Sequence, residues 1–510
     1  MVKNVLLITA DQFRGDCLSA HGHAHVATPH LDALARDGTA FRQHFCQATP
    51  CAPSRASLLT GLYLMNHRVV FNGTPLDQRH DNIARMARRH GYDPVLFGYT
   101  DQTRDPRVSR DDDPWMNTYE GVLPGFRTGP RGGVMLDGYG QPWRQWLAAR
   151  GVDVPANEID LYLPDPQTYP NPGKHPSLDP PRFSSDETET AFLVGAFTDY
   201  AEKQGQSPWF AHLSFLRPHP PFCAPAPYNT LFDPAKMPPP LRAQSPANEG
   251  QQHPYLATLL GSVQADHYIA NGQGLVTDFD DDDVAVLRAI YFAMIAEVDA
   301  QVGRLIAWLK AHDQYEDTLI IFTSDHGEML GDHYLFGKSG YFDGAYHIPL
   351  IIRDPEATHQ GHVVHRFTEN IDIVPTILDH LGLAQPVTLD GRALTPFLNG
   401  VEPSDWRQEV HWEHDFRHAA RQAGLPDSDH SDDRQLAVIR SERFKYVHFG
   451  DLPPLLFDLQ EDPNEHYNRA GDPQYADVLS DLRSRMLSWR MRHSGRGLSH
   501  MLATADGIMS

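Results

Sequence analysis

Stretches of consecutive apolar residues alternate along most of the chain with stretches whose apolar residues recur at helical spacing. The first kind has the length and composition of strands buried on both faces, and it occupies residues 4–9, 94–99, 210–215, 319–323 and 348–352. The second kind predicts helices at residues 31–37, 83–90 and 285–311. Strands that alternate with helices are typical of an α/β fold, so we expect a large, mostly parallel sheet flanked by helices.

The pattern changes after about residue 388. Short runs that mix polar and apolar residues follow at 436–439 and 445–448, and an apolar run at 455–459 precedes the turn Asp462-Pro463-Asn464-Glu465. This texture predicts a smaller α+β unit. We therefore divide the chain into a large α/β domain, residues 1–388, and a C-terminal α+β subdomain with a tail, residues 389–510.

Two proline-rich segments interrupt the alternation. Thirteen prolines lie between Arg104 and Pro181, and a second segment extends from Pro218 to Pro254. Long irregular segments in compact enzymes are commonly lids, binding loops or subunit contacts. Loosely ordered surface insertion is the alternative for both.

Composition and charge exclude several classes of function. The 510 residues include 43 Lys and Arg against 66 Asp and Glu, a formal net charge of −23, which argues against a nucleic-acid partner. An enzyme of this charge that acts on a small anion must concentrate positive charge inside its pocket. The apolar run at residues 5–8 is too short for a signal-peptide core, and no apolar stretch reaches the roughly 18 residues of a membrane span. We expect a cytoplasmic protein that does not enter a membrane.

One of the four cysteines lies in the most informative string of the chain. Residues 49–55 read Thr-Pro-Cys-Ala-Pro-Ser-Arg, with a proline two residues and an arginine four residues after Cys51. Because Pro53 suits the first turn of a helix, we expect Cys51 at a helix N-terminus, where the helix dipole favours an anion, and Arg55 one turn later. The alternative is a buried cysteine that begins a core helix. Four scattered cysteines are too few for a disulfide framework.

Polar residues follow two of the predicted strands. Asp11 and Gln12 come after the strand at 4–9, and Asp325 and His326 come after the strand at 319–323. Ligand sites of open α/β sheets lie beyond the carboxyl ends of parallel strands, so we expect these residues to converge with Cys51. Together they offer carboxylate, carbonyl and imidazole ligands for a metal. A single Asp after a strand is usually a turn or cap residue, and a hydrogen-bonding role is the alternative for His326.

These motifs resemble those of the sulfatase family, a branch of the alkaline phosphatase superfamily. The cysteine motif continues, as in that family, into Ala56-Ser57-Leu58-Leu59-Thr60-Gly61, and the resemblance extends from Asn4 to about Asn468. It implies that residues 1–388 form the catalytic domain and that a formylglycine-generating enzyme converts Cys51 to formylglycine. The implied ligands of one divalent metal are Asp11, Gln12, residue 51, Asp325 and His326.

Further segments resemble parts of the sulfatase pocket. Residues 218–222 resemble the family's P-H-x-P-F loop, and residues 336–338 resemble the segment with its downstream lysine. The resemblance thus implies catalytic roles for Cys51, Arg55, His219 and Lys338, and Asn72 is a candidate donor to a substrate oxygen. A structural histidine, a solvent-exposed lysine and a turn asparagine are the alternatives.

Several positions depart from the common sulfatase pattern. Gln12 replaces an Asp and His326 replaces an Asn, which makes the metal site less suited to calcium, so we favour manganese and keep calcium, iron and zinc open. Tyr99 and Asp101 stand where sulfatases have the Lys and His that hold the sulfate. A pocket with fewer cations favours a singly charged ester, although a strand-end tyrosine and a turn-capping aspartate need no functional role. The resemblance is greatest to the phosphonate monoester hydrolase/phosphodiesterase group, which has Gln after the first Asp and Tyr in place of the Lys.

The resemblance implies a formylglycine-dependent metallohydrolase that cleaves phosphonate monoesters and phosphodiesters, with promiscuous hydrolysis of sulfate esters. One hydroxyl of the hydrated aldehyde attacks phosphorus or sulfur, and loss of the second hydroxyl's proton expels the product by C–O cleavage. We also expect a homo-oligomer. The alternatives are an arylsulfatase, a catalytically inactive binding protein, and a two-metal phosphatase or phosphomutase with unmodified Cys51, for which Asp343, His347 and His333 are spare ligands.

Overall fold

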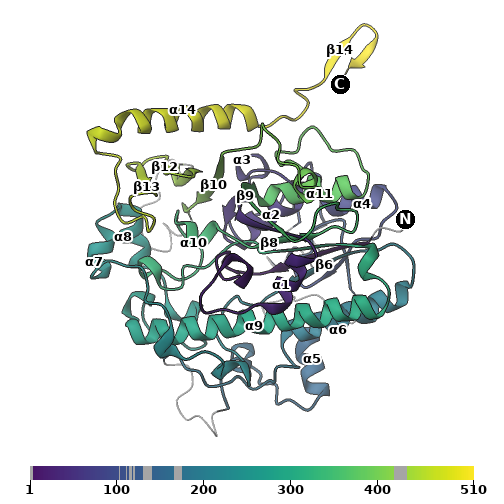
Figure 1. Cartoon of the computed structure of the whole chain (residues 1–510), viewed down its shortest axis with the longest axis vertical. Coiled ribbons are helices and arrows are strands. Elements are labelled where there is room, and N and C mark those ends of the chain that lie inside the picture. Colours follow the sequence, from purple (N-terminus) through teal and green to yellow (C-terminus); the bar gives the residue numbers. More distant parts are fainter. Residues whose placement is uncertain are drawn as a thin grey trace.

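An eight-stranded sheet forms the centre of the larger part of the chain, with strand order β5-β4-β6-β1-β7-β8-β2-β9 (Figure 1). The computed structural model describes residues 4–509 except 103, 111, 114, 115, 117, 119, 120, 130–140, 166–174 and 418–432, so part of the first proline-rich segment lies outside the described residues. Within the sheet, only β8 runs against its neighbours. The predicted, mostly parallel α/β sheet is confirmed. Its strands are β1 (Asn4–Ala10), β2 (Thr39–Phe45), β4 (Val95–Phe97), β5 (Arg127–Thr128), β6 (Phe210–Phe215), β7 (Thr318–Thr323), β8 (Leu350–Arg353) and β9 (His362–Glu369).

Helices cover both faces of this sheet because alternate residues of each central strand are apolar on either side. In β1, Leu6 and Ile8 pack into one core with α1, α5, α6 and α9, whereas Val5 and Leu7 pack into a second core with α2, α4, α11 and α12. The helices of the first face are α1 (Pro29–Arg36), α5 (Gln141–Ala149), α6 (Glu189–Gln204) and α9 (Asp281–Ala311). Those of the second face are α2 (Cys51–Thr60), α4 (Ile83–Arg89), α11 (Ile373–His380) and α12 (Thr395–Leu398).

The predicted elements are found with shifts of a few residues at their ends. The longest helix, α9, begins four residues before the predicted residue 285, because Asp280 caps it by accepting a hydrogen bond from the Asp283 amide. Three further aspartates in its first turn and Lys310 in its last turn suit the helix dipole. At 348–352 the strand begins only at Leu350, after Pro349, and it is the antiparallel member of the sheet.

A second sheet of five strands, ordered β13-β12-β11-β10-β3, forms the C-terminal part. Its strands are β3 (Ala48–Thr49), β10 (Glu409–Asp415), β11 (Gln435–Ser441), β12 (Phe444–Phe449) and β13 (Leu455–Asp458), and α14 (Ala476–His493) packs against it. The edge strand β3 comes from the N-terminal part and immediately precedes the Cys51 segment. The C-terminal α+β unit is confirmed, while the division at residue 388 stays a prediction.

The second proline-rich segment is built into the molecule by polar contacts. It contains α7 (Pro246–Gly250) and leads into α8 (Pro254–Leu260), and Arg288 of α9 donates hydrogen bonds to the carbonyls of Pro238 and Pro239. Two short helices, α3 (Leu64–His67) and α10 (Asp343–Tyr346), complete the α-helices of the described residues. None of the described helices is both long and apolar enough to cross a bilayer.

The chain ends in a hairpin of β14 (Leu502–Thr504) and β15 (Gly507–Met509), which projects from the end of α14 (Figure 1). Its apolar side chains are exposed, with Leu502 at 61% and Ile508 at 67% of their full accessible surface. A two-stranded hairpin is marginally stable by itself in water.

Candidate active site

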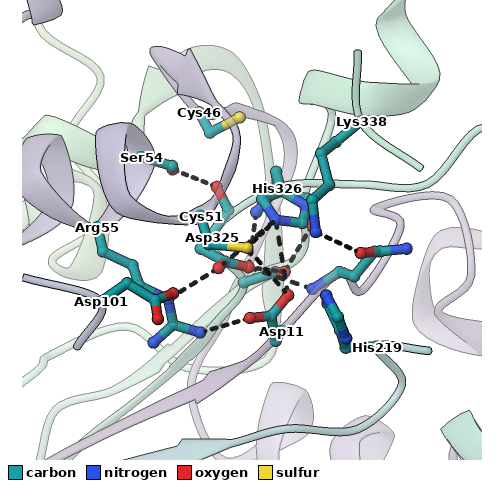
Figure 2. Close-up of polar contacts among 12 residues, drawn as sticks. Asp11, Cys46, Cys51, Ser54, Arg55, Asp101, His219, Asp325, His326 and Lys338 are labelled. Carbon is teal, nitrogen blue, oxygen red and sulfur yellow. Dashed lines mark hydrogen bonds and ion pairs between the residues drawn. The ribbon is translucent and has the colours of Figure 1, made fainter. Parts of the chain in front are cut away.

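The carboxyl ends of four neighbouring parallel strands, β4, β6, β1 and β7, form the site. Tyr99 and Asp101 follow β4, His219 follows β6, Asp11 follows β1, and Asp325 with His326 follows β7. The adjacent position of these strands brings together residues that are more than 300 positions apart in the chain. Figure 2 shows the convergence around Cys51. The predicted convergence of these residues with Cys51 beyond the strand ends is thereby confirmed, while their roles stay predictions.

Cys51 is the first residue of α2, and the helix ends at Gly61, which adopts the left-handed conformation with φ 71°. The Sγ atom of Cys51 lies 3.2 Å from His326 Nε2 and 3.9 Å from Asp11 Oδ1. The first turn of the helix is fixed from outside, because the Ala52 amide donates to Asn72 Oδ1 (2.9 Å) and Gln102 donates to the Ala52 carbonyl (2.8 Å). Burial, together with the charges of Asp11 and Asp325, raises the pKa of the Cys51 thiol well above its usual range.

Arg55 lies one turn further along α2 and is completely buried. Its Nε donates to Asp325 Oδ2 (2.9 Å) and its Nη2 donates to Asp11 Oδ2 (2.9 Å). Its Nη1 donates to the Tyr99 carbonyl (3.1 Å) and to the Ser214 hydroxyl (2.6 Å). Arg55 therefore holds the two carboxylates on one side of Cys51, and all three of its nitrogens are engaged by protein atoms.

Asp11, Cys51, Asp325 and His326 each offer a ligand atom, and these four atoms lie within 4.8 Å of one another. Burial opposes ionisation of both carboxyls. Nearby cationic groups, including Arg55 and Lys338, lower the pKa of Asp11 well below its usual range, whereas burial and the charge of Asp11 raise the pKa of Asp325 to about 6. A divalent cation between the two carboxylates would relieve this repulsion, so the donor set and the local charge fit a metal ion.

His326 is oriented as a metal ligand. Its Nδ1 lies 3.1 Å from the Gly327 carbonyl, to which it donates when protonated, leaving the Nε2 lone pair directed at Cys51 and Asp11. Burial and the nearby Lys338 lower the pKa of His326 to about 3. The ring is therefore neutral near pH 7, which is the form that binds metals.

Gln12 joins the metal side of the site to Lys338. Its backbone adopts φ 68°, and its amide N–H donates to Asp325 Oδ1 (3.1 Å). The side-chain carbonyl of Gln12 accepts a hydrogen bond from Lys338 Nζ (2.8 Å), and its amide group donates to Glu328. The Gln12 carbonyl oxygen thus faces a cation in this structure, and its role as a metal ligand stays a prediction.

His219 and Lys338 lie across Cys51 from Arg55 and Asp101 (Figure 2), and both are partly exposed. His219 Nδ1 lies 2.8 Å from the Pro220 carbonyl, so a neutral ring carries its proton there and leaves Nε2 as an acceptor. Burial and the nearby Lys338 lower the pKa of His219 to about 4. Acid catalysis by Nε2 consequently needs a second proton on the ring.

The three residues predicted to bind substrate contact the nucleophile and metal cluster. The Tyr99 hydroxyl donates to Asp11 Oδ2 (2.6 Å), and its ring packs on the Arg55 guanidinium at 4.3 Å. Asp101 Oδ2 lies 3.3 Å from Arg55 Nε, and Asn72 caps α2. A contact with substrate stays a prediction for all three.

Comparison with known proteins gives the family. The Sulfatase family model matches residues 3–383. The chain belongs to the sulfatase family. A second model, described as N-sulphoglucosamine sulphohydrolase, C-terminal, matches residues 331–492, so the two matches overlap at residues 331–383, before the predicted division at residue 388.

This sulfatase-family chain is similar over its whole length to three relatives. It is 43% identical over 514 residues, 99% of this chain and 98% of the relative, to the multifunctional alkaline phosphatase superfamily protein PehA of Trinickia caryophylli. The crystal structure of the phosphonate monoester hydrolase of Agrobacterium radiobacter has a TM-score of 0.94 and 49% identity, and the match covers 100% of this chain and 99% of that one. The phosphonate monoester hydrolase SpPMH from Silicibacter pomeroyi has a TM-score of 0.92 and 42% identity, with the same coverage.

Sequence reasoning assigned no role to three residues of this sulfatase-family site. Ser214 binds Arg55, Glu328 binds Gln12, and Gln102 binds the first turn of α2. The sequence could have indicated Ser214, because a hydroxyl residue stands there in the buried, otherwise mostly apolar strand β6. Glu328 lies two residues after His326, but spacing alone does not distinguish it from a turn residue.

The spare ligands of the two-metal alternative lie in other contacts. Asp343 pairs with Lys445 and Arg440, and His347 bonds the Arg42 carbonyl. His333 bonds Glu249. Among the described residues, none of the three belongs to the group of ligand atoms around Cys51.

Proposed function

We propose that this sulfatase-family hydrolase cleaves phosphonate monoesters and phosphodiesters, and hydrolyses sulfate esters more slowly. The observation that carries the proposal is the placement of Tyr99 and Asp101. The Tyr99 hydroxyl is bound to Asp11 and the Asp101 carboxylate to Arg55, so neither position adds a cation for a dianionic substrate. Whole-length similarity to two phosphonate monoester hydrolases and to PehA supports the same substrate class.

The ligand group fits one divalent metal, and we favour manganese. Two carboxylates and one neutral imidazole, with Cys51 adjacent, form a mixed oxygen and nitrogen set that suits a transition metal better than calcium. Bound there, the metal would supply Lewis-acid stabilisation of negative charge on the substrate. The residues that would hold it are Asp11, Asp325, His326 and residue 51, and Gln12 would complete the set through its carbonyl oxygen.

Conversion of Cys51 to formylglycine is the second part of the proposal. As a thiol, Cys51 has a raised pKa, and burial is the largest cause, so its surroundings disfavour the thiolate that nucleophilic attack requires. The hydrated aldehyde of formylglycine would supply hydroxyl nucleophiles at the same position. Arg55 contributes by keeping Asp11 and Asp325 in place beside residue 51.

Lys338 and His219 are the groups left to meet the substrate. Lys338 is partly exposed, and burial opposes the charge of its amine while Cys51 and Asp11 raise its pKa, so the amine stays cationic at neutral pH. It can donate to a nonbridging oxygen as negative charge develops there. His219 can contact the leaving oxygen, either as a proton donor once doubly protonated or as a hydrogen-bond partner.

The mass of the tryptic peptide that spans residues 43–55 tests the conversion. Formylglycine at position 51 lowers the mass by about 18 Da, because the side chain loses a sulfur and two hydrogens and gains an oxygen, and its hydrate is the covalent nucleophile. Cys46 lies in the same peptide and serves as an internal control, because only it should then be alkylated by iodoacetamide. An active preparation with two alkylated cysteines would overturn the proposal.

Elemental analysis tests the metal. We expect close to one manganese per chain in the Asp11/Asp325/His326 site of an active preparation, and loss of most activity on chelation, restored by Mn²⁺. Activity that survives complete removal of divalent metal would refute the assigned site. If chelation abolishes activity but residue 51 is not formylglycine, the metal proposal would hold and the formylglycine proposal would be wrong.

We further propose that the enzyme is cytoplasmic, is matured by a formylglycine-generating enzyme and assembles into a homo-oligomer. None of the four cysteines forms a disulfide, which suits a reducing compartment. The exposed apolar side chains of the β14–β15 hairpin support oligomerisation, because contact with a second copy would bury them. Sedimentation of the full chain and of a variant ending at residue 497 tests this, since the shortened chain should be monomeric.

A further inference from the structure

A second group of potential metal ligands lies outside the active site, where three segments meet. Glu249 lies on α7, His333 in the short helix η10 (Asp332–Tyr334), and His466 in the segment that follows β13. Each offers one ligand atom, and the three atoms lie within 4.8 Å of one another. Glu249 and His333 are both 3% exposed, while His466 is partly exposed, so the group is buried but accessible from one side.

Contacts within the protein fix two of the three side chains. Glu249 Oε1 lies 2.7 Å from His333 Nδ1, and Glu249 Oε2 accepts from the Ala243 amide (2.6 Å). The His333 ring stacks on Phe342 with centroids 3.8 Å apart. The His466 ring lies 5.3 Å from the His333 ring, and within the described residues it makes no hydrogen bond to protein. Two ligands held by the protein and one imidazole with no hydrogen bond among the described residues therefore lie close together.

The ligand set suits zinc. Two imidazoles and one carboxylate, with a water as fourth ligand, form a tetrahedral site in which zinc lies about 2.0–2.1 Å from each ligand atom. Zinc would replace the proton shared by Glu249 and His333, and small movements of the three side chains would bring their donors to coordination distance.

The position of His333 links this group to the active site. The segment between Glu328 and Lys338 folds back on itself through the hydrogen bonds Met329 N to Gly337 O (3.0 Å) and Gly331 N to Leu335 O (2.8 Å). We call residues 329–337 the lysine loop, because Lys338 follows it and contacts Gln12. His333 lies at the tip of the loop, and Glu328 at its base accepts from the Leu330 and Gly337 amides.

His466 is anchored on the other side of the group. Gln252 donates to the carbonyls of Glu465 and His466, and Glu465 accepts from the Asp343 amide and pairs with Lys445. A metal shared by His333 and His466 would therefore tie the tip of the lysine loop to the C-terminal sheet. We propose that Glu249, His333 and His466 bind a zinc ion that fastens the lysine loop to the C-terminal part.

Zinc stoichiometry of the full chain tests the site. Metal-stripped native protein is equilibrated with Zn²⁺ alone, freed of excess zinc and measured for zinc per chain, in parallel with His466→Ala and with His267→Ala. His267 is an exposed histidine whose side chain is 63% accessible, so it controls for adventitious binding by imidazoles. We expect about two zinc ions per chain in the native protein and in His267→Ala, one at each ligand group, and about one in His466→Ala.

A second measurement separates this site from the catalytic one. The test uses a chain that carries Asp325→Asn, which weakens the catalytic ligand group. In this chain, zinc should slow hydrogen exchange of the lysine loop. In a chain that carries both Asp325→Asn and His466→Ala, zinc should leave that exchange unchanged. Equal zinc content in the native and His466→Ala proteins would overturn the proposal. So would zinc-independent exchange of the lysine loop in the Asp325→Asn chain, which would leave Glu249 and His333 as a hydrogen-bonded structural pair.

Discussion

The two cations beside residue 51 differ in what they contact. Arg55 is completely buried, and all three of its nitrogens donate to protein acceptors that include Asp11 and Asp325. Lys338 is partly exposed on the opposite side, where it donates to Gln12 Oε1 (2.8 Å) and lies close to residue 51. The nitrogens of Arg55 are therefore all occupied by protein acceptors, whereas the Lys338 ammonium has N–H groups left to donate to a substrate.

This difference indicates that Arg55 maintains the structure of the site, whereas Lys338 is available to contact the substrate. Three aspartates, Asp11, Asp101 and Asp325, converge on Arg55, so removal of Arg55 would take a buried cation from all three. A planar guanidinium serves this purpose because it binds several carboxylates in fixed directions. A flexible ammonium such as that of Lys338 suits contact with a substrate oxygen whose charge changes during the reaction.

The largest expected effect lies between the two cations, at residue 51. Cys51→Ala removes the precursor of the nucleophile, so kcat/KM for an aryl phosphonate monoester should fall by about 10⁴-fold or more. Cys51→Ser should accumulate a covalent ester, visible by intact mass, because it lacks the second hydroxyl that expels the product. Cys46→Ala, a change at a nearby buried cysteine, is the matched control and should retain most activity. Multiple turnover by Cys51→Ala would sink the mechanism.

On the arginine side, Arg55→Lys should damage both stability and activity. A lysine cannot supply the separate donors that reach Asp11, Asp325 and Ser214, and breaking buried ion pairs costs about 3–5 kcal/mol. We expect a clearly lower unfolding temperature, a lower content of bound metal and a loss of about 10³-fold in kcat/KM, because both carboxylate ligands shift. Calorimetry and elemental analysis of the same samples measure these effects.

On the lysine side, Lys338→Met should lower activity without this loss of stability. The substitution keeps the length of the side chain, and one partly buried hydrogen bond from a charged group contributes about 1.5–3 kcal/mol, less than the several contacts of Arg55. Removing one donor from a developing oxyanion typically costs about 10²-fold to 10³-fold in kcat. If Lys338→Met and Arg55→Lys lowered the unfolding temperature equally, the distinction between the two sides would be wrong.

The two sides also differ in how far the sequence predicted them. Asp11, Asp325 and His326 were predictable because they follow buried strands, and parallel strand ends meet at one edge of the sheet. The motif around Cys51 predicted the helix start, and Arg55 follows by helical spacing. The contacts of Tyr99 and Asp101 with this cluster were not predictable, because a strand-end residue can point to either substrate or ligand.

The paths of loops and the pairing of edge strands could not be predicted from the sequence for a similar reason. The lysine loop carries positive φ at His333 and Tyr334, and no local pattern specifies such a path. The pairing of β3 with β10 joins residues about 365 positions apart, so neither strand alone predicts the shared sheet. The group of Glu249, His333 and His466 has no motif, since its members come from three separate loops and short helices.

The smallest predicted effect, preference for substrate charge, is also the sharpest test of the lysine side. With Tyr99 and Asp101 bound to Asp11 and Arg55, the cation that the described part of the pocket offers the substrate near neutral pH, besides the metal, is Lys338. We expect kcat/KM for the p-nitrophenyl phosphonate monoester and phosphodiester to exceed that for the phosphate monoester by more than tenfold, which needs only about 1.4 kcal/mol of differential transition-state binding.

A phosphate monoester loses its second proton near pH 6, whereas a diester does not titrate there. The ratio of diester to monoester rates should therefore shrink as the pH falls below about 6, because the monoester becomes singly charged and the enzyme's own titration cancels in the ratio. A ratio that is independent of pH would show that shape, not charge, sets the preference. A wide preference for p-nitrophenyl sulfate would make the enzyme an arylsulfatase and would refute the interpretation of Tyr99.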